Sequence, residues 1–222
     1  MDFECLGLSR FVVAVPDHEE FDEKPYGKVS KHSMAYLKSL EFEKGAKILD
    51  LETFLNFLNE KKVGAQIELK DFNLAKIITH TVQEVELNPA ELRGPIVFTS
   101  FNPLAVLKLR RVMKKQGICL LDNAQNIKGF GFGLQAIQLG SFFGKWVLRQ
   151  CSKRQIWGFM THYRYLPMKM IEYAHQLNVR FCPRVPDDKN LVLSYIDANV
   201  DGFETDNVPF IIECIEKAGY SF

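Results

Sequence analysis

A carboxylate and an ammonium close a short alternating stretch of this sequence. In residues 63–70, apolar side chains alternate with Gln66, Glu68 and Lys70. A period of two places the polar residues on one face of a β-strand. A carboxylate can ligate a hard divalent cation, and an ammonium can contact a phosphate oxygen as a point charge. Two interpretations stay open on this pattern alone: a solvated strand face, or the polar lining of the catalytic mouth of a parallel barrel.

Length and charge limit the class of protein. The chain has 222 residues, 47% of them hydrophobic, which is enough for one large core. Its 28 Lys+Arg and 27 Asp+Glu leave a formal net charge of +1, so no general field attracts nucleic acid. The absence of a linker or repeat then predicts a single domain over residues 1–222, and the balanced charge predicts that it binds no nucleic acid.

Cysteine usage and hydropathy indicate the compartment. The five cysteines are far apart and form no C-x-x-C pair, which argues against a disulfide framework or a zinc site. The N-terminus is neither basic nor followed by a long apolar run, so no signal peptide is expected. No stretch reaches the ~20 apolar residues of a transmembrane helix. We expect a soluble, cytoplasmic protein with reduced thiols.

Strand-like and helix-like segments alternate along the chain. Strands are expected at 3–8, 11–15, 64–70, 95–101, 118–121, 156–161, 179–182 and 202–205. Helices are expected at 30–40, 73–84, 103–115, 167–177, 188–199 and 208–218, and another helix is expected to begin after Asp50, which is its N-cap. Residues 129–133 (Gly-Phe-Gly-Phe-Gly) lack the G-x-G-x-x-G spacing of a nucleotide site, and we interpret them as a flexible loop.

Repeated strand–helix units predict right-handed crossovers and a parallel sheet. An open doubly wound sheet and a closed barrel both fit. The short strands and the absence of a glycine fingerprint favour the barrel, and about seven of its strands can be counted.

Four short motifs carry a family resemblance over nearly the whole chain. Residues 67–70 (Ile-Glu-Leu-Lys) resemble the "IE-x-K" strand of the glycerophosphodiester phosphodiesterases, and 48–55 resemble the segment before it. Residues 98–103 and 200–206 are similar to the family's "SSF-n" strand end and its closing "GVDGiiTD" strand. The resemblance implies an α/β fold, a TIM-type (β/α)8 barrel. The family's opening "HRG" and "PENT" motifs are not found, so the expected barrel lacks its first strand-helix unit.

Other positions depart from the family pattern. Glu4 stands where the family has the glutamate of "iE-x-D", but Leu6 replaces the aspartate. Pro16 replaces the histidine of "HD", and His18 lies two residues further on. The resemblance thus implies one metal-ligating carboxylate and two motif histidines fewer than the family has.

The resemblance implies a reaction and a set of roles. The family hydrolyses a glycerophosphodiester to an alcohol and glycerol 3-phosphate with Mg²⁺ or Ca²⁺, in the metabolism of lipid head groups. Glu4 and Glu68 would be metal ligands, Lys70 would bind the substrate phosphate, and His18 would be the catalytic residue. His162, just after an expected strand, is the other histidine that could face a barrel mouth. A non-catalytic relative that binds a ligand or a protein partner is the alternative, and a start codon placed too late is a third possibility.

An incomplete barrel has a physical consequence. Seven strands leave two unpaired edges, at the first strand and the last, and such edges pair readily with other chains. We expect the gap to be covered by the loop of residues 17–27 or closed by a homodimer.

Overall fold

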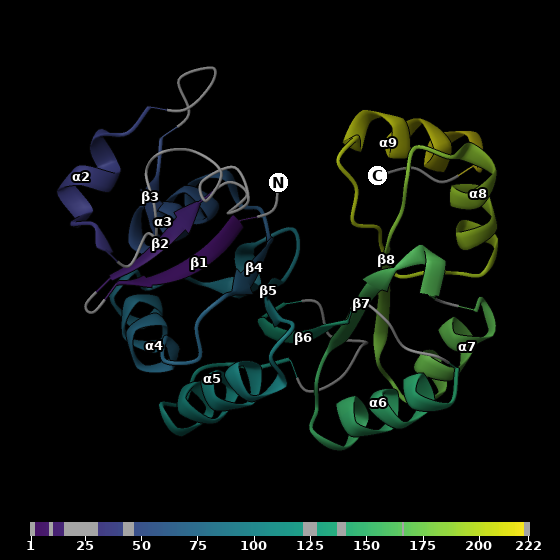
Figure 1. Ribbon diagram of the computed structural model, residues 1–222, viewed down its shortest axis with the longest axis horizontal. Coiled ribbons are helices and arrows are strands. Elements are labelled where there is room, and N and C mark those ends of the chain that lie inside the picture. The colour runs from purple at the N-terminus through teal and green to yellow at the C-terminus, as the bar shows by residue number, and fades with distance from the viewer. Residues whose placement is uncertain are drawn as a thin grey trace. The chain divides into compact units, whose positions relative to one another are not determined.

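The computed structural model describes residues 3–8, 11–15, 31–41, 47–121, 128–136, 141–165 and 167–219, the first two ranges by their backbone alone. The chain forms two compact units. The first comprises residues 1–121 with 126–132, and the second comprises 122–125 with 133–222. Each unit combines parallel strands with helices (Figure 1). The prediction of a single domain stays a prediction.

The sheet of the first unit has the strand order β3-β2-β1-β4-β5. Its central strands β1 (Phe3–Leu8), β4 (Ala65–Leu69) and β5 (Ile96–Ser100) are parallel. Strand β2 (Phe11–Val15) returns antiparallel to β1, and β3 (Leu49–Asp50) pairs antiparallel to β2. The expected unpaired edge at the first strand is wrong, because β2 covers the side of β1 that faces away from β4. An unpaired edge at the first strand was the argument for a homodimer there, and that argument does not apply to β1.

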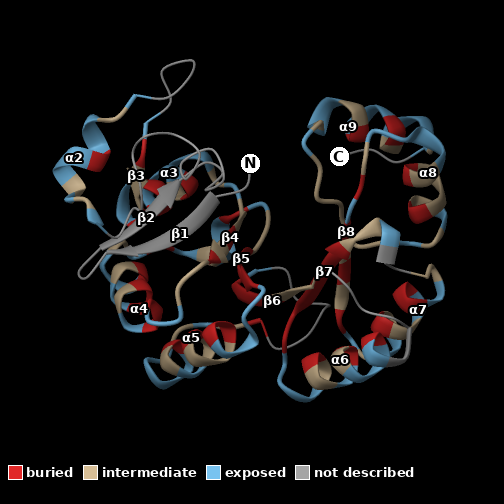
Figure 2. Cartoon of the chain, in the orientation of Figure 1, coloured by how far each residue is buried: buried red, intermediate tan, exposed pale blue. Residues whose placement is uncertain are grey.

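The helices of the first unit are α2 (Met34–Ser39), α3 (Leu51–Lys61), α4 (Ala75–Glu84) and α5 (Pro103–Lys115), with a 3-10 turn η3 at Pro89–Glu91. The predicted cap of α3 is confirmed, since the Asp50 carboxylate accepts a hydrogen bond from the Thr53 backbone N–H at 2.7 Å. The apolar side chains of α3 at i, i+3, i+4 and i+7, from Leu51 to Leu58, form a stripe that is buried (Figure 2). The helix α2 begins after Ser33, later than the sequence indicated.

Gly64 brings the beginnings of β4 and β5 together. A Cβ at this position would lie 2.4 Å from the carbonyl oxygen of Pro95, a distance that no side chain tolerates. The next residue, Ala65, donates its N–H to that same oxygen at 3.0 Å. This contact sets the register in which Glu68 on β4 stands level with Thr99 on β5.

The second unit has the strand order β6-β7-β8. Residues 133–136 of β6 (Phe130–Ala136) pair parallel with β7 (Gly158–His162), which pairs parallel with β8 (Arg180–Arg184). The helices are α6 (Ser141–Lys153), α7 (Lys169–Gln176), α8 (Lys189–Asp197) and α9 (Val208–Lys217), with a 3-10 turn η4 at Tyr163–Tyr165. Asp188 caps α8 through two backbone N–H groups.

The loop expected at residues 129–133 is wrong. Phe130 and Phe132 are buried on β6, and their rings lie 6.2 and 6.3 Å from that of Phe98 on β5. Aromatic burial of this kind outweighs the conformational cost of the intervening glycines. The strand expected at 118–121 is reduced to a single bridge between Leu120 and Phe130, and the strand expected at 202–205 to one between Arg184 and Glu204. Helix α6 was not predicted.

Across the part of the chain that the structure describes, no helix is long and apolar enough to cross a membrane.

Candidate functional site

The predicted site lies at the carboxyl ends of β4 and β5, next to the beginning of β1. Glu68 stands level with Glu4 on one side and with Thr99 on the other. Residues at equal register in neighbouring parallel strands project to the same face of a sheet. The backbone therefore places the two predicted metal ligands, Glu4 and Glu68, next to each other. The side chain of Glu4 and the whole of His18 lie outside the described residues.

Glu68 and Lys70 form an ion pair. The Nζ atom of Lys70 lies 2.8 Å from Oε1 of Glu68, and the side chains are 21% and 14% exposed, respectively. An ion pair with this little solvent is screened less than one on an open surface. The alternation in residues 63–70 has its predicted outcome: Ile67 and Leu69 are buried among the apolar core residues, while Glu68 and Lys70 lie together on the other face.

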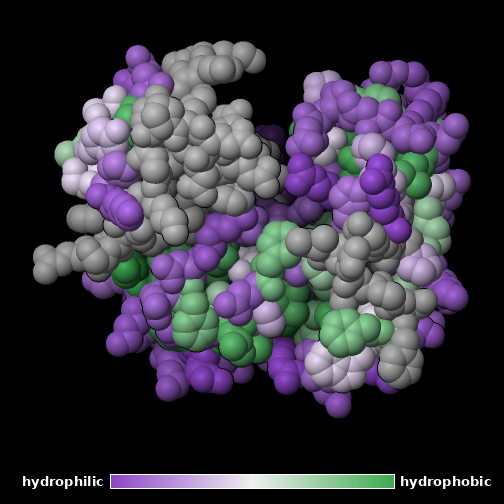
Figure 3. Space-filling view, in the orientation of Figure 1, coloured by the Kyte–Doolittle hydropathy of each residue, from purple (hydrophilic) through white to green (hydrophobic). Residues whose placement is uncertain are grey.

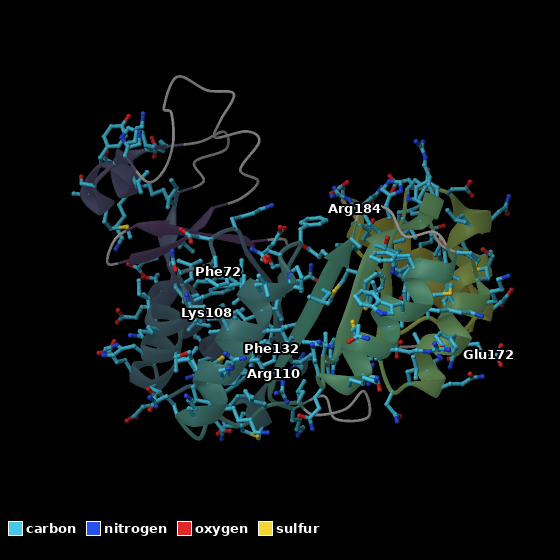
Figure 4. All side chains as sticks on the ribbon, turned by 60° about the horizontal axis from the view of Figure 1, so that its bottom comes forward. Phe72, Lys108, Arg110, Phe132, Glu172 and Arg184 are labelled. Carbon is cyan, nitrogen blue, oxygen red and sulfur yellow. The ribbon has the colours of Figure 1, made fainter. Side chains whose placement is uncertain are left out.

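Aromatic side chains accompany lysines at both strand ends. Lys70 Nζ is 5.9 Å from the centroid of the Phe101 ring, just after β5. Lys108 on α5 lies over the ring of Phe72, just after β4, at 4.1 Å from its centroid (Figure 4). Phe72 and Phe101 are both exposed. An ammonium over an aromatic face is attracted by the ring quadrupole, so these contacts restrain both lysines at the edge of the site.

Thr99 is the residue that sequence reasoning missed. Its side chain is fully buried beside Glu68, and its Oγ1 atom has no hydrogen-bond partner among the described residues. A buried hydroxyl without a partner costs free energy, so this atom is a candidate to accept a hydrogen bond from, or donate one to, a bound group. The neighbouring Ser100 is instead satisfied, because it donates to the Leu69 carbonyl at 2.7 Å and accepts from the Asn102 N–H at 3.1 Å. The signal was present in the sequence as the first hydroxyl of the strand-end motif at residues 98–103.

The described residues can be tested for a divalent-cation site. Mg²⁺ and Ca²⁺ take several oxygen ligands. Among the side chains that the structure describes, no group of three or more His, Cys, Asp or Glu is arranged to hold a metal ion. Glu68 contributes one carboxylate, already paired with Lys70, and Thr99 one hydroxyl. These residues do not complete a site by themselves; the register makes Glu4 the second carboxylate available to it.

A second group of polar side chains ends the strands of the other unit. His162 on β7 stands level with Arg184 on β8, as the sequence predicted for a histidine at a strand end. Burial lowers the pKa of the His162 imidazole, and the positive charges of Arg164 and Arg184 lower it further. Arg184 forms an ion pair with Asp206 at 3.3 Å. His162 is therefore held toward its neutral form.

Comparisons with known proteins identify the fold. No protein-family model and no curated protein sequence matches the chain. Solved structures do match. A glycerophosphodiester phosphodiesterase from Parabacteroides distasonis superposes with a TM-score of 0.74 at 18% identity, over 99% of this chain and 84% of that chain. A phosphodiesterase from Oleispira antarctica, in complex with the product sn-glycerol-3-phosphate, gives 0.74 at 16% identity, over 97% and 84%. The glycerophosphodiester phosphodiesterase of Thermotoga maritima gives 0.61 at 17% identity, over 96% and 83%.

These structures are TIM-type α/β barrels, and the similarity shows that this chain has the same class of fold. Within that class, the chain has the fold of the glycerophosphodiester phosphodiesterases. The fold that the four motifs indicated is confirmed.

Proposed function

We propose that this protein is a metal-dependent phosphodiester hydrolase that acts on small glycerophosphodiesters at the carboxyl ends of β4 and β5, beside Glu4 near the beginning of β1. The observation that carries the proposal is the Glu68–Lys70 pair at a strand end of this fold. A solved structure of the same fold holds sn-glycerol-3-phosphate, a product of the proposed reaction. Release of an alcohol and glycerol 3-phosphate is the corresponding chemistry.

The roles follow from charge and position. Lys70 would exchange its contact with Glu68 for a phosphate oxygen, which replaces one charge-assisted interaction by another. Glu68 and Glu4 would hold Mg²⁺ or Ca²⁺, which when bound neutralises phosphate charge. Thr99 would offer its buried hydroxyl to the same ligand. When Lys70 leaves Glu68 to contact the phosphate, the Glu68 carboxylate would become available to the cation. Binding of the phosphate would thereby favour binding of the cation.

Leu6 and Pro16, which replace an aspartate and a histidine of the family motifs, determine the rate of hydrolysis that we expect. General acid–base groups contribute roughly 10²–10⁴-fold each, so slow turnover is expected unless another group transfers the proton. His18 is our candidate for that role, because it lies two residues beyond Pro16 in the chain.

The same substitutions favour a second candidate function. Leucine cannot ligate a cation and proline cannot transfer a proton, whereas Lys70 and Thr99 need neither partner to contact a phosphate. The second candidate is a non-catalytic relative that binds a phosphorylated ligand or a protein partner at this site.

Turnover tests the first candidate. Glycerol 3-phosphate released from glycerophosphocholine would be measured with Mg²⁺ and with Ca²⁺ for the wild type, Glu68→Gln and His18→Ala. We expect Glu68→Gln to lower the rate about 10–100-fold, the range seen when support of a metal site is lost. Glu91→Gln is the matched control, because Glu91 forms an exposed ion pair with Lys62 in the same unit, at 2.6 Å. Equal release by the wild type and Glu68→Gln would rule out the metal-dependent hydrolase.

Binding separates the two candidates. The affinity for sn-glycerol 3-phosphate would be measured by calorimetry for the wild type, Lys70→Met and Glu91→Gln. Loss of a charge-assisted contact is expected to weaken binding about tenfold in Lys70→Met and to leave Glu91→Gln unchanged. Binding that depends on Lys70 without turnover supports the second candidate. Absence of both binding and turnover rejects both.

A further inference from the structure

Helix α6 exposes a stacked aromatic pair. Phe143 and Trp146, three residues apart and so neighbours on one face, are 55% and 52% exposed. Their ring centroids lie 5.4 Å apart with an interplanar angle of 20°. The opposite side of the helix is buried through Leu148 and Cys151. Side chains of this size are seldom left together in water without a partner surface.

The charge along this part of the sequence has a single sign. Between Asp122 and Glu172 the sequence contains seven lysines and arginines and no acidic residue, in a chain whose net charge is only +1. Three of these basic residues, Lys145, Arg149 and Lys153, belong to α6 itself. In the space-filling view, hydrophobic and near-neutral side chains reach the surface over α6 with hydrophilic atoms around them (Figure 3). The helix thus combines exposed aromatic rings with unneutralised positive charge.

Two of the basic side chains of α6, Lys145 and Arg149, are held in place by contacts with Tyr173 of α7. The Arg149 Nε–H donates to the Tyr173 hydroxyl of α7 at 2.6 Å, and Lys145 Nζ lies 5.3 Å from the centroid of the Tyr173 ring. Neither contact neutralises the charge, because tyrosine is uncharged. The side chains therefore keep their charge at the helix surface and lose part of their conformational freedom before any partner arrives.

We propose that α6 is a peripheral docking surface for an anionic membrane. Phe143 and Trp146 enter the headgroup region, where amphipathic aromatic rings are favoured, and Lys145, Arg149 and Lys153 contact anionic lipid headgroups. Each lysine or arginine near such a surface strengthens binding about fivefold. A second copy of this chain would bring the same positive charges face to face, which disfavours self-association through this helix. This inference does not rest on the proposed hydrolysis.

Vesicle binding tests it with the full chain. Co-sedimentation would be measured with vesicles of phosphatidylcholine alone and of phosphatidylcholine with phosphatidylserine. We expect binding to the second kind only, weakening as salt is raised. Phe143→Ala/Trp146→Ala and Lys145→Glu/Arg149→Glu are each expected to lose at least tenfold in affinity. Both side chains of the first variant are more than half exposed, so its melting temperature should stay close to that of the wild type.

Helix α3 provides the matched control. Phe57 is 47% exposed, and Lys61 Nζ lies 6.0 Å from its ring centroid, but α3 also contains Glu52 and Glu60. Phe57→Ala therefore removes an exposed aromatic ring beside a lysine without touching a basic surface. It is expected to bind anionic vesicles as the wild type does.

Tryptophan fluorescence reports on the same contact directly. The chain has two tryptophans, and Trp157 is only 7% exposed. A blue shift of the emission on addition of anionic vesicles should come from Trp146 and vanish in Trp146→Phe. Wild-type protein that stays unbound, or equal binding by Phe143→Ala/Trp146→Ala, overturns the proposal. A dimer that only this variant loses would show a protein interface instead.

Discussion

Glu68 and Lys70 form the partly buried ion pair on which the proposed anion site depends. The Lys70 Nζ and Glu68 Oε1 atoms lie 2.8 Å apart and form an ion pair. Removing the Glu68 carboxylate would cost Lys70 this ion pair and keep its contact with the Phe101 ring. A phosphate that binds Lys70 must compete with Glu68, unless a cation takes up the carboxylate at the same time. Cation and phosphate are therefore expected to strengthen each other's binding.

Asp50 is the residue whose protonation is expected to matter for stability. Burial by itself would raise the pKa of this carboxyl, but hydrogen bonds from Lys38 and Thr53 outweigh it and lower the pKa below the ordinary 3.8. A lowered folded-state pKa means that the stabilisation is present above the unfolded-state value and is lost as the pH falls through the folded-state value.

We predict that Asp50→Ala lowers the free energy of unfolding by about 1 kcal/mol at about pH 7, as loss of an N-cap typically does. Urea unfolding of the two proteins checks this. The difference should shrink as the pH falls below 3.8, the ordinary value of this carboxyl, because its folded-state pKa lies lower. A difference that stays constant as the pH falls would assign the loss to packing rather than to the cap.

At the scale of elements, β6 shows that burial overrides local composition. Its first four residues are buried although two of them are glycines. The phenylalanines at 130 and 132 both contact Phe98, so the strand is held by side chains far away in the sequence.

Phe132→Ala is expected to cost about 3–5 kcal/mol, because the ring is completely buried and its removal leaves a cavity. Phe143→Ala, on the exposed face of α6, is the control and should change stability by no more than about 0.5 kcal/mol. Guanidinium unfolding measures both. Similar small losses in the two variants would mean that residues 129–133 behave as a loop.

At the scale of the molecule, the reactivity of the cysteine thiols measures how well the folded protein excludes solvent from its interior. Burial raises the pKa of Cys151 to about 12, and burial with the nearby carboxylates of Asp201 and Glu204 raises that of Cys182 to about 12. By accessible surface, Cys151 and Cys214 are buried, Cys182 is half-buried and Cys119 is exposed. All four are free thiols.

We predict that only Cys119 reacts quickly with a disulfide reagent at about pH 8 when Cys5→Ser is the background, because the thiolate is the reacting form. In Cys5→Ser/Cys119→Ser, the remaining thiols should react only as fast as the protein opens, and fully in denaturant. Absorbance of the released thiolate follows the reaction. Fast reaction of this second variant in buffer would show that the buried thiols are accessible in the native state.

Much of the fold could be predicted from local patterns. The helix at 103–115 has the bounds that its proline and apolar spacing indicated, and Asp50 caps α3. Helix α6 and strand β6 were missed for different reasons. The glycines of β6 predict a loop because the conformational preference of a single residue takes no account of packing against Phe98, which is distant in the sequence. Helix α6 lacks a recognisable cap signal, and its exposed face carries Phe143 and Trp146, which blur the usual separation of apolar and polar faces.

The sequence by itself determined the alternation that places Glu68 and Lys70 on one strand face, and the order of motifs that indicated the barrel. Both are properties of neighbouring residues, which a period of two and a run of short motifs express directly. Only the tertiary structure decided that Glu68 pairs with Lys70, that Glu4 stands level with Glu68, and that Thr99 is buried beside Glu68. These relations depend on strand register, and register is set by contacts such as that of Gly64 with the Pro95 carbonyl, which join residues about 30 positions apart.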